Sequence, residues 1–287
     1  MSTQVSTAFV NQFSSNVQLL SQQMGSLLRS SVSEESVTGE KAFFDQVGAV
    51  AAVKRTSRHG DTPLVETPHS RRQVTLETYE WADLIDDADK VRMLIDPTST
   101  YAQAAAAAMG RAIDDEIITA ATGTSKTGKS GSTSTSLPAA QQIAAGSADL
   151  TVAKLLSAKE ILDGNSVDPS LPRHIVCGPA QISALLNTTE VKSSDFNTVK
   201  ALARGELNSF LGFTFHMSTR LSVASNIRTC FAWAQDGLML AVGKDVMSRI
   251  EERADKSYST QVYYCQTIGS TRMEEDKVVQ ILCDESA

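Results

Sequence analysis

The chain lacks a long apolar run, a pair of neighbouring cysteines and an excess of positive charge, and each absence excludes a class of protein. Its 287 residues contain no stretch long and apolar enough to span a membrane. No basic segment precedes an apolar run at the N-terminus, so we expect no secretory signal. The four cysteines are widely separated, which argues against a zinc site or a disulfide scaffold and suits a reducing cytoplasm. A formal net charge of −7 argues against a dedicated DNA-binding domain.

The sequence also lacks a recognisable catalytic or metal-binding constellation. His59 and His69 fall in a polar stretch, and His174 and His216 stand alone beside predicted strands. No Cys/His or Ser/His/Asp set has the spacing of a nucleophile and its base. The carboxylate clusters are interpreted as solvated helix faces. We therefore predict that the protein is not an enzyme and has no catalytic, cofactor-binding or metal-binding residues.

One string imitates a phosphate-binding loop. Residues 123–130 read GTSKTGKS, and the fixed positions of G-x-x-x-x-G-K-[ST] are occupied by Gly123, Gly128, Lys129 and Ser130. That motif binds phosphate when a buried strand enters the loop and a helix leaves it. Here a helical, alanine-rich pattern precedes the string and a Gly/Ser/Thr-rich stretch follows it. We interpret the match as coincidence, with a P-loop nucleotidase as the alternative of a different class.

The first 33 residues have a single charged side chain, Arg29. Their apolar residues step by four and three, which places them on one stripe of a helix. The stripe includes Phe9, Phe13, Leu20 and Met24. Such a helix needs another surface to cover its apolar side. Two interpretations remain open: a helix packed on its own core, or an arm that binds a partner.

Residues 49–82 are predicted to form an extended hairpin, with AVAAVKRTS and RRQVTLETYEW as its strands and a long polar tip between them. The hairpin is basic, through Lys54, Arg55, Arg58, Arg71 and Arg72. The chain turns acidic immediately afterwards, at Asp83, Asp86, Asp87 and Asp89. This change of sign suggests contacts between opposite charges on different copies of the chain, although solvated surface charge is the alternative.

The remaining pattern predicts an α+β chain with a separate mixed domain in the middle. A long helix is expected over residues 98–122, with Asp114, Asp115 and Glu116 facing solvent. Helices and strands then alternate: a helix at 150–162, a strand at RHIVCG, a helix that begins at Pro179, a segment SSDFNTVKALARGEL and a strand at GFTFHMS. The last fifty residues are predicted to be mostly strand.

This order of parts resembles the major capsid proteins of tailed bacteriophages, which share the Hong Kong 97 (HK97) fold. Four strings are similar to one phage capsid family: GEKAFFDQVG, WADLIDDADKVRMLIDPTSTYAQAAAAAMGRAIDDEII, SSDFNTVKALARGE and DKVVQILCDE. The resemblance implies an N-terminal arm at 1–48 and an extended loop at 49–82. It also implies a peripheral domain with a long spine helix at 83–136 and 238–287, and an inserted axial domain at 137–237.

The resemblance implies a structural protein that self-assembles as hexamers and pentamers into an icosahedral shell around double-stranded DNA. Its partners would be further copies of itself, a scaffolding protein and a portal, with a decoration protein as a further candidate. Contact with packaged DNA would be non-specific, no membrane would be involved, and assembly would take place in the host cytoplasm before release of the virion. An encapsulin-like nanocompartment, which encloses protein cargo, is the alternative within the same fold.

Overall fold

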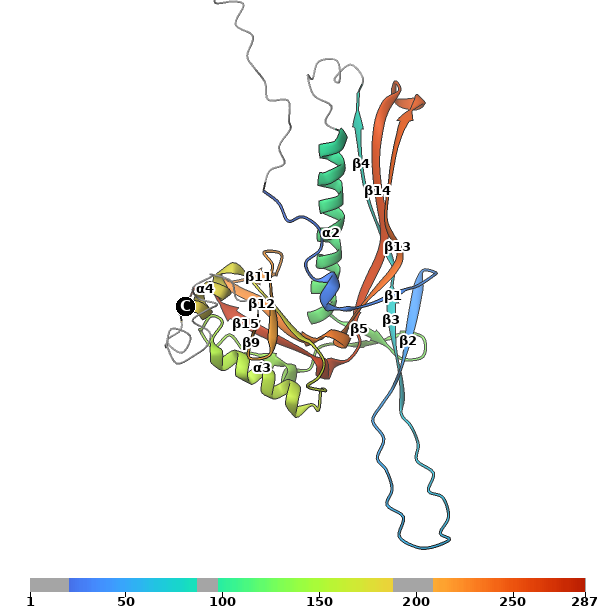
Figure 1. Ribbon diagram of the computed structural model, residues 1–287, viewed down its shortest axis with the longest axis vertical. Helices are drawn as coiled ribbons and strands as arrows, with labels where there is room; N and C mark the ends of the chain where they lie inside the picture. The colour runs from blue at the N-terminus through green and yellow to red at the C-terminus, as the bar shows by residue number, and fades with distance from the viewer. Residues whose placement is uncertain (1–20, 87–97, 188–208, 287) are drawn as a thin grey trace, which may run out of the picture.

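The computed structural model describes residues 21–86, 98–187 and 209–286. The described part consists of three β-sheets and three α-helices, with a long loop that extends away from the body (Figure 1). No helix within the described ranges is long and apolar enough to cross a membrane.

The longest strands form a four-stranded sheet against which the longest helix packs. Its order is β1 (Ser33–Ser36), β13 (Leu238–Arg253), β14 (Ser259–Arg272) and β4 (Glu77–Ile85). The helix α2 (Thr98–Thr122) runs beside β4 and β14 (Figure 1). Met109, Ile113 and Ile117 lie four residues apart on its buried side, together with small alanines that allow the helix close to the sheet. The helix predicted over residues 98–122 is confirmed.

The second sheet forms the core of a mixed α/β unit. It runs in the order β7 (Gln142–Ile143), β15 (Val278–Asp284), β12 (Ile227–Ala234), β8 (Arg173–Cys177), β10 (Phe213–Met217) and β9 (Ser209–Phe210), while β11 (Val223–Ala224) pairs with β12. Two helices belong to this unit, α3 (Val152–Gly164) and α4 (Pro179–Asn187). The predicted strands at RHIVCG and GFTFHMS and the helix at Pro179 are confirmed, and the helix predicted at 150–162 is displaced by two residues.

The C-terminal strand β15 belongs to this second sheet. It pairs antiparallel with β12 over seven residues and parallel with β7. The strand was expected from its apolar sequence, but the segment 238–287 was expected to stay together in the peripheral domain. In the structure β13 and β14 lie in the first sheet and β15 in the second.

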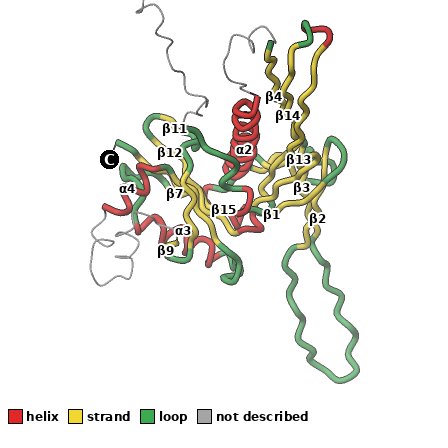
Figure 2. Tube along the Cα trace, turned by 45° about the horizontal axis from the view of Figure 1, so that its top comes forward, coloured by secondary structure: helices red, strands yellow, loops and turns green. Residues whose placement is uncertain are grey.

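A third, smaller sheet supports the extended loop. It runs in the order β2 (Lys41–Val47), β3 (His69–Thr75), β5 (Ser125–Thr127) and β6 (Thr133–Thr135). The predicted hairpin was partly wrong. Its first strand is KAFFDQV at 41–47 and not AVAAVKRTS, and residues 48–68 form irregular chain beyond the ends of β2 and β3 (Figure 2). Its second predicted strand is divided at Leu76, where the chain passes from β3 in the third sheet to β4 in the first.

The interpretation of the helix carboxylates as solvated was wrong for one residue. Asp114 is fully buried, whereas Asp115 and Glu116 are partly exposed. Several other predictions concern residues outside the described ranges: the segment SSDFNTVKALARGEL from 193 to 207, and the residues Phe9, Phe13, Leu20, Asp87 and Asp89.

Candidate functional site

The loop at residues 48–68 is the most exposed segment of the described chain. Every residue from Val47 to Ser70 is exposed, and the Leu64 side chain is 98% accessible to solvent. Val50, Val53 and Val65 are also exposed large apolar residues. The ends of the loop are fixed, because the Gly48 amide donates a 2.8 Å hydrogen bond to the Pro68 carbonyl. A segment that exposes this much apolar surface on a fixed base is typical of a site that binds another protein.

The five basic residues predicted at this hairpin fall into two groups. Lys54, Arg55 and Arg58 lie on the exposed loop, where the Arg55 Nε donates to the Ser57 carbonyl at 2.9 Å. Arg71 and Arg72 lie on β3, next to each other in sequence but on opposite faces of the strand. The structure therefore separates three cations on the loop from two at its base.

Both arginines at the base have carboxylate partners within the chain. Arg71 forms a bidentate pair with Asp45 on β2, at 2.5 and 3.0 Å, and its guanidinium lies 5.5 Å from the centre of the Phe43 ring. The hydrogen bond to Asp45 raises the pKa of Arg71. Arg72 is buried and forms a second bidentate pair with Glu275, at 2.8 and 2.5 Å. The charge-matching hypothesis consequently depends on the three cations of the loop.

The described residues of the predicted acidic patch, Asp83 and Asp86, lie at the other end of the subunit. Asp83 is exposed near the end of β4, with one carboxylate oxygen accepting from the Leu84 amide, and Asp86 is exposed just beyond that strand. Figure 1 shows β4 running away from the body in the direction opposite to the loop. The acidic and basic patches are therefore not brought together within one subunit. Only two copies of the chain could join them.

The string GTSKTGKS forms a strand and a turn and not a phosphate-binding loop. Ser125–Thr127 is strand β5, and Gly128 adopts a φ of +88° that favours glycine. The Gly128 amide donates to the Arg71 carbonyl at 3.2 Å, and the chain returns as strand β6. No helix begins after Ser130 in this hairpin, so neither a helix N-terminus nor its dipole faces Lys129.

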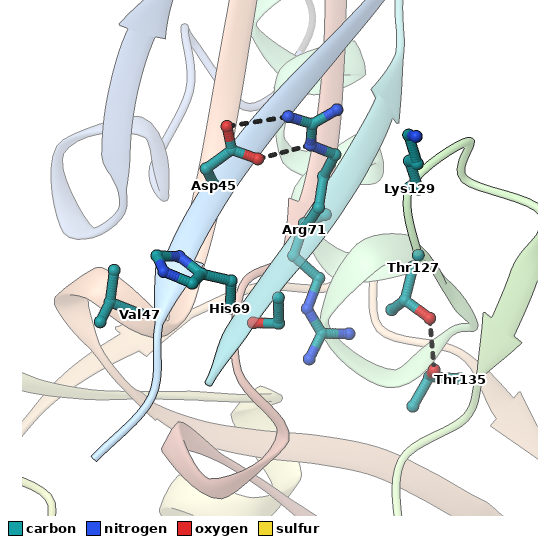
Figure 3. A pocket seen from close by; sticks show the side chains of 10 residues that line it. Asp45, Val47, His69, Arg71, Thr127, Lys129 and Thr135 are labelled. Atoms are coloured by element: carbon teal, nitrogen blue, oxygen red, sulfur yellow. Dashed lines mark hydrogen bonds and ion pairs between the residues drawn. The ribbon is translucent and has the colours of Figure 1, made fainter. Parts of the chain in front are cut away.

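The hairpin instead lines a groove of about 910 Å³ at the base of the loop (Figure 3). Val47, His69 and Arg71 line one side of the groove, and Thr127, Lys129 and Thr135 line the other. The Thr127 and Thr135 hydroxyls lie 3.1 Å apart across β5 and β6. The lining is mostly polar and charged, with Val47 as its one apolar side chain, whereas small-molecule pockets are lined mostly by apolar groups.

A buried arginine that the sequence did not reveal connects the first sheet with the third sheet and with the end of α2. Arg272, at the end of β14, donates to the carbonyls of Ala121 and Gly123 at 3.0 and 2.7 Å, where α2 ends, and to the Thr135 carbonyl on β6 at 3.1 Å. Its Nε lies 3.6 Å from Glu275, the partner of Arg72. These contacts fix the supporting sheet of the loop, the end of α2 and the turn at Glu275 relative to one another.

His174 and His216, which were predicted to stand alone, contact each other and form an aromatic cluster with Trp233. Their ring nitrogens Nδ1 and Nε2 lie 3.2 Å apart on β8 and β10, and both rings pack on Trp233 of β12. Within the described ranges no group of three His, Cys, Asp or Glu residues could hold a metal ion. Burial, followed by the charge of His216, lowers the pKa of His174 to about 4, and burial also lowers the pKa of His216 despite the nearby carboxylate of Asp114.

We expect this cluster to make the subunit acid-sensitive. The folded state favours the neutral form of His174. The contribution of His174 to the free energy of unfolding is therefore complete above the pKa of about 6.5 that it has in the unfolded chain, and this contribution is lost as the pH falls towards about 4. The lowered pKa of His174 corresponds to a loss of about 3 kcal/mol at most in the free energy of unfolding. Urea unfolding of the wild type and of His174→Gln between pH 7 and 4 measures the difference. If the two free energies of unfolding fall in parallel, the pH dependence has another origin.

The described geometry is similar to that of known phage shell proteins. A family model described as phage capsid protein matches residues 5–285. The capsid protein of the cyanophage P-SCSP1u matches with a TM-score of 0.78 and 18% identity, covering 97% of this chain and 94% of that one. The capsid protein of Ralstonia phage GP4 matches with a TM-score of 0.74 and 13% identity, covering 96% and 95%. No curated protein matches the sequence significantly.

These similarities confirm the predicted α+β, HK97-like capsid fold. A third structure, from Mycobacterium phage Che8, has a TM-score of 0.67 and 16% identity, covering 97% of this chain and 98% of that one. Neither the family match nor these structures support an encapsulin-like compartment or a P-loop nucleotidase.

Proposed function

This chain belongs to the phage capsid protein family and is a structural subunit of the virion shell, and we propose that it assembles as hexamers and pentamers into an icosahedral particle around double-stranded DNA. The observation that carries the proposal is the family match, which extends over residues 5–285. Purified particles test it directly through their symmetry and their contents. Protein cargo in place of DNA would favour the encapsulin-like alternative.

We propose the following division of the chain between the domains of the fold. Residues 1–40 form the N-terminal arm, and β2 and β3 form the base of the extended loop. Residues 77–136 with β13 and β14 form the peripheral domain, and residues 137–237 form the axial domain. Strand β15 is assigned to the axial domain, because it pairs with β12 and β7. The extended loop is limited to residues 48–68, since β2 and β3 on either side of it belong to the supporting sheet.

We propose that the loop lies on a neighbouring subunit and that its cations meet the acidic end of β4 there. Two observations support this. Lys54, Arg55 and Arg58 are exposed on the loop, and Asp83 lies at the opposite end of the molecule. In a closed ring, a contact between the loop of one copy and the acidic end of β4 in the next copy is repeated at every interface, so each subunit both gives and receives it. A single exposed ion pair is weak, but a closed shell repeats it many times.

Reversing the loop charges is expected to suppress assembly without unfolding the subunit. The change is Lys54→Glu with Arg55→Glu and Arg58→Glu, all on exposed residues outside the strands. We expect an unchanged circular dichroism spectrum and a shell yield lower by on the order of tenfold, because every interface loses the attraction. High salt should weaken wild-type assembly in the same direction. Sedimentation measures the yield.

The rescue variant identifies the partner patch. Adding Asp83→Lys and Asp86→Lys to the loop reversal restores opposite charges and should recover most of the lost yield. The acidic reversal alone serves as the matched control and should assemble as poorly as the loop reversal. A loop reversal that assembles like the wild type would show that the loop cations are merely solvated.

A scaffolding protein, a portal and a decoration protein are proposed as further partners, and the host cytoplasm as the place of assembly. Family membership supports these proposals. Co-expression of the chain with the products of neighbouring phage genes tests them, since each true partner should change particle size, yield or composition.

A further inference from the structure

The root of the N-terminal arm lies directly on the helix α2. We define the arm root as residues 22–31. Figure 1 shows this segment beside the lower half of α2. Leu28 and Ser31 within it are buried, whereas Met24 is 58% exposed. The helical stripe expected along the arm was wrong at its described end, because residues 21–28 form no helix and Met24 is exposed. The buried apolar contact is made by Leu28, which was not part of that stripe.

One buried carboxylate accepts hydrogen bonds from several polar groups of the arm root. Asp114 on α2 has no exposed surface. Its oxygens accept hydrogen bonds from Gln23 Nε2 and Ser26 Oγ, both at 2.5 Å, and from the amides of Leu27 and Leu28 at 3.0 and 3.1 Å. These donors come from four residues of the arm and none from α2 itself. A buried carboxylate is tolerated only when hydrogen bonds replace its water, and here the arm supplies them.

The neighbouring positions of the helix allow this close approach. Gly110 lies one turn before Asp114, and a Cβ atom at Gly110 would lie 2.4 Å from the carbonyl carbon of Gly25. Gly25 itself has a φ of +76°, which favours glycine and turns the chain at this point. Arg111 donates from Nη1 to the Gln22 side chain at 2.9 Å and to the Gln23 carbonyl at 3.1 Å. On α2, Gly110 thus leaves room for the backbone of the arm root, and Arg111 binds it through hydrogen bonds.

The other end of the arm root contacts β12 of the second sheet and β13 of the first sheet. Trp233 on β12 donates its indole Nε1–H to the Ser31 carbonyl at 2.9 Å. Arg29 pairs with Glu34 and with Asp245 on β13, at 2.6 and 3.1 Å. The root is consequently fixed at three points, on α2, on β12 and on β13.

We propose that Asp114 is a positioning residue for assembly: it fixes the point and the direction from which the arm leaves the subunit, and so decides which neighbour the arm can reach. This inference rests on the proposed function of the arm in the shell. Asp114 acts through the arm and does not itself contact a neighbour. The proposal differs from a purely stabilising role, because it requires that release of the root lowers assembly even when the subunit remains folded.

The test uses trypsin, because Arg29 is the only basic residue before Lys41. Cleavage after Arg29 therefore reports release of the root, and cleavage at the exposed loop residues Lys54, Arg55 and Arg58 is an internal reference in the same sample. In Asp114→Asn the amide cannot accept hydrogen bonds at both ends. We expect the ratio of Arg29 cleavage to loop cleavage to rise by at least about tenfold, as the loss of a charge-assisted hydrogen bond implies, and the particle yield to fall with it.

Matched variants separate positioning from general damage. Asp115→Asn changes the adjacent carboxylate, which pairs with Arg220 and not with the arm, and should leave the Arg29 cleavage ratio unchanged. Gly110→Ala should release the root by steric exclusion alone, and Gln23→Ala with Ser26→Ala should release it from the arm side while α2 stays intact. In the double variant Gln23→Glu with Asp114→Asn, donor and acceptor are exchanged, which should partly restore both protection and yield.

The experiment distinguishes failure of the proposed shell function from failure of the role proposed for Asp114. If the wild type forms no particles with any scaffold, the proposed function fails and the assembly role of Asp114 fails with it, whereas the Arg29 cleavage ratio still reports whether Asp114 holds the root. If the wild type assembles and Asp114→Asn shows the same cleavage ratio, or a raised ratio with a normal yield of particles, the positioning role of Asp114 is overturned. If Asp114→Asn does not fold, the variant Gln23→Ala with Ser26→Ala decides, through the same Arg29 cleavage ratio and the same particle yield.

Discussion

Deleting residues 49–67 and joining Gly48 to Pro68 through Asn-Gly is expected to give a folded subunit that forms no shells. The fold should survive because Gly48 and Pro68 already lie opposite each other, with a 2.8 Å hydrogen bond between them. The pairing of β2 with β3 is complete without the loop, and Asn-Gly is a favoured two-residue hairpin turn. Assembly should fail because the exposed apolar and cationic surface of the loop is removed from every interface.

Thermal unfolding and electron microscopy of the same preparation measure the two properties. A variant in which residues 49–67 are replaced by a Gly/Ser segment of equal length is the matched control for chain length, and it should also fail to assemble. Leu64→Asn is the corresponding point variant, because its side chain is 98% exposed and should affect assembly alone. Normal shells from the deletion variant would refute the role assigned to the loop.

Replacing Arg272 by methionine is expected to have the largest effect on stability. The guanidinium is fully buried and donates to three backbone carbonyls, two of them at the end of α2, where a positive charge also favours the helix dipole. Methionine fills a similar volume but donates nothing, so these buried carbonyls lose their partner. We expect a loss of about 3–5 kcal/mol in the free energy of unfolding, because three buried carbonyls lose their donor at roughly 1–3 kcal/mol each.

Urea unfolding of the purified subunit measures the loss, with Arg253→Met as the matched control. Arg253 pairs with Asp255 at the exposed end of the β13–β14 hairpin, so its replacement should change stability little. Arg272→Lys keeps the charge but loses the planar fork and should be intermediate. If Arg272→Met and Arg253→Met have equal stabilities, the buried network does not hold the first and third sheets and the end of α2 together.

Local patterns predicted the elements of this fold well, because they depend on neighbouring residues. The spacing of Met109, Ile113 and Ile117 and the alanine-rich first half determine α2 without reference to the rest of the chain. The strand β8 was equally predictable, since Ile175, Val176 and Cys177 form a short apolar run and Pro179 marks the helix that follows.

Pairing between distant segments was less predictable. AVAAVKRTS is as apolar as a strand, but nothing in its own residues shows that KAFFDQV takes its place beside β3. Likewise, VVQILCD is buried on both faces and reads as a strand in either sheet, so its position beside β12 could not be inferred. The burial of Asp114 depends on the arm root, ninety residues away in sequence, and the helical pattern around it gives no sign of this contact.

The candidate site was predicted in its composition and not in its arrangement. The cations of the loop and the acids after β4 were visible as a change of sign along the chain. The sequence did not show which of these charged residues have a partner within the subunit, because the partner of Arg72 is Glu275, 203 residues later. The separation of the remaining cations from Asp83, at opposite ends of the subunit, required the structure (Figure 1).

A reconstruction of purified particles by electron microscopy tests the central claim most directly. We predict icosahedral shells of this chain in which residues 48–68 of each subunit lie on a neighbour, with Lys54, Arg55 and Arg58 near the acidic end of its β4. Shells in which this loop contacts no other subunit, or preparations that contain only dispersed subunits when the scaffold is present, would contradict the account.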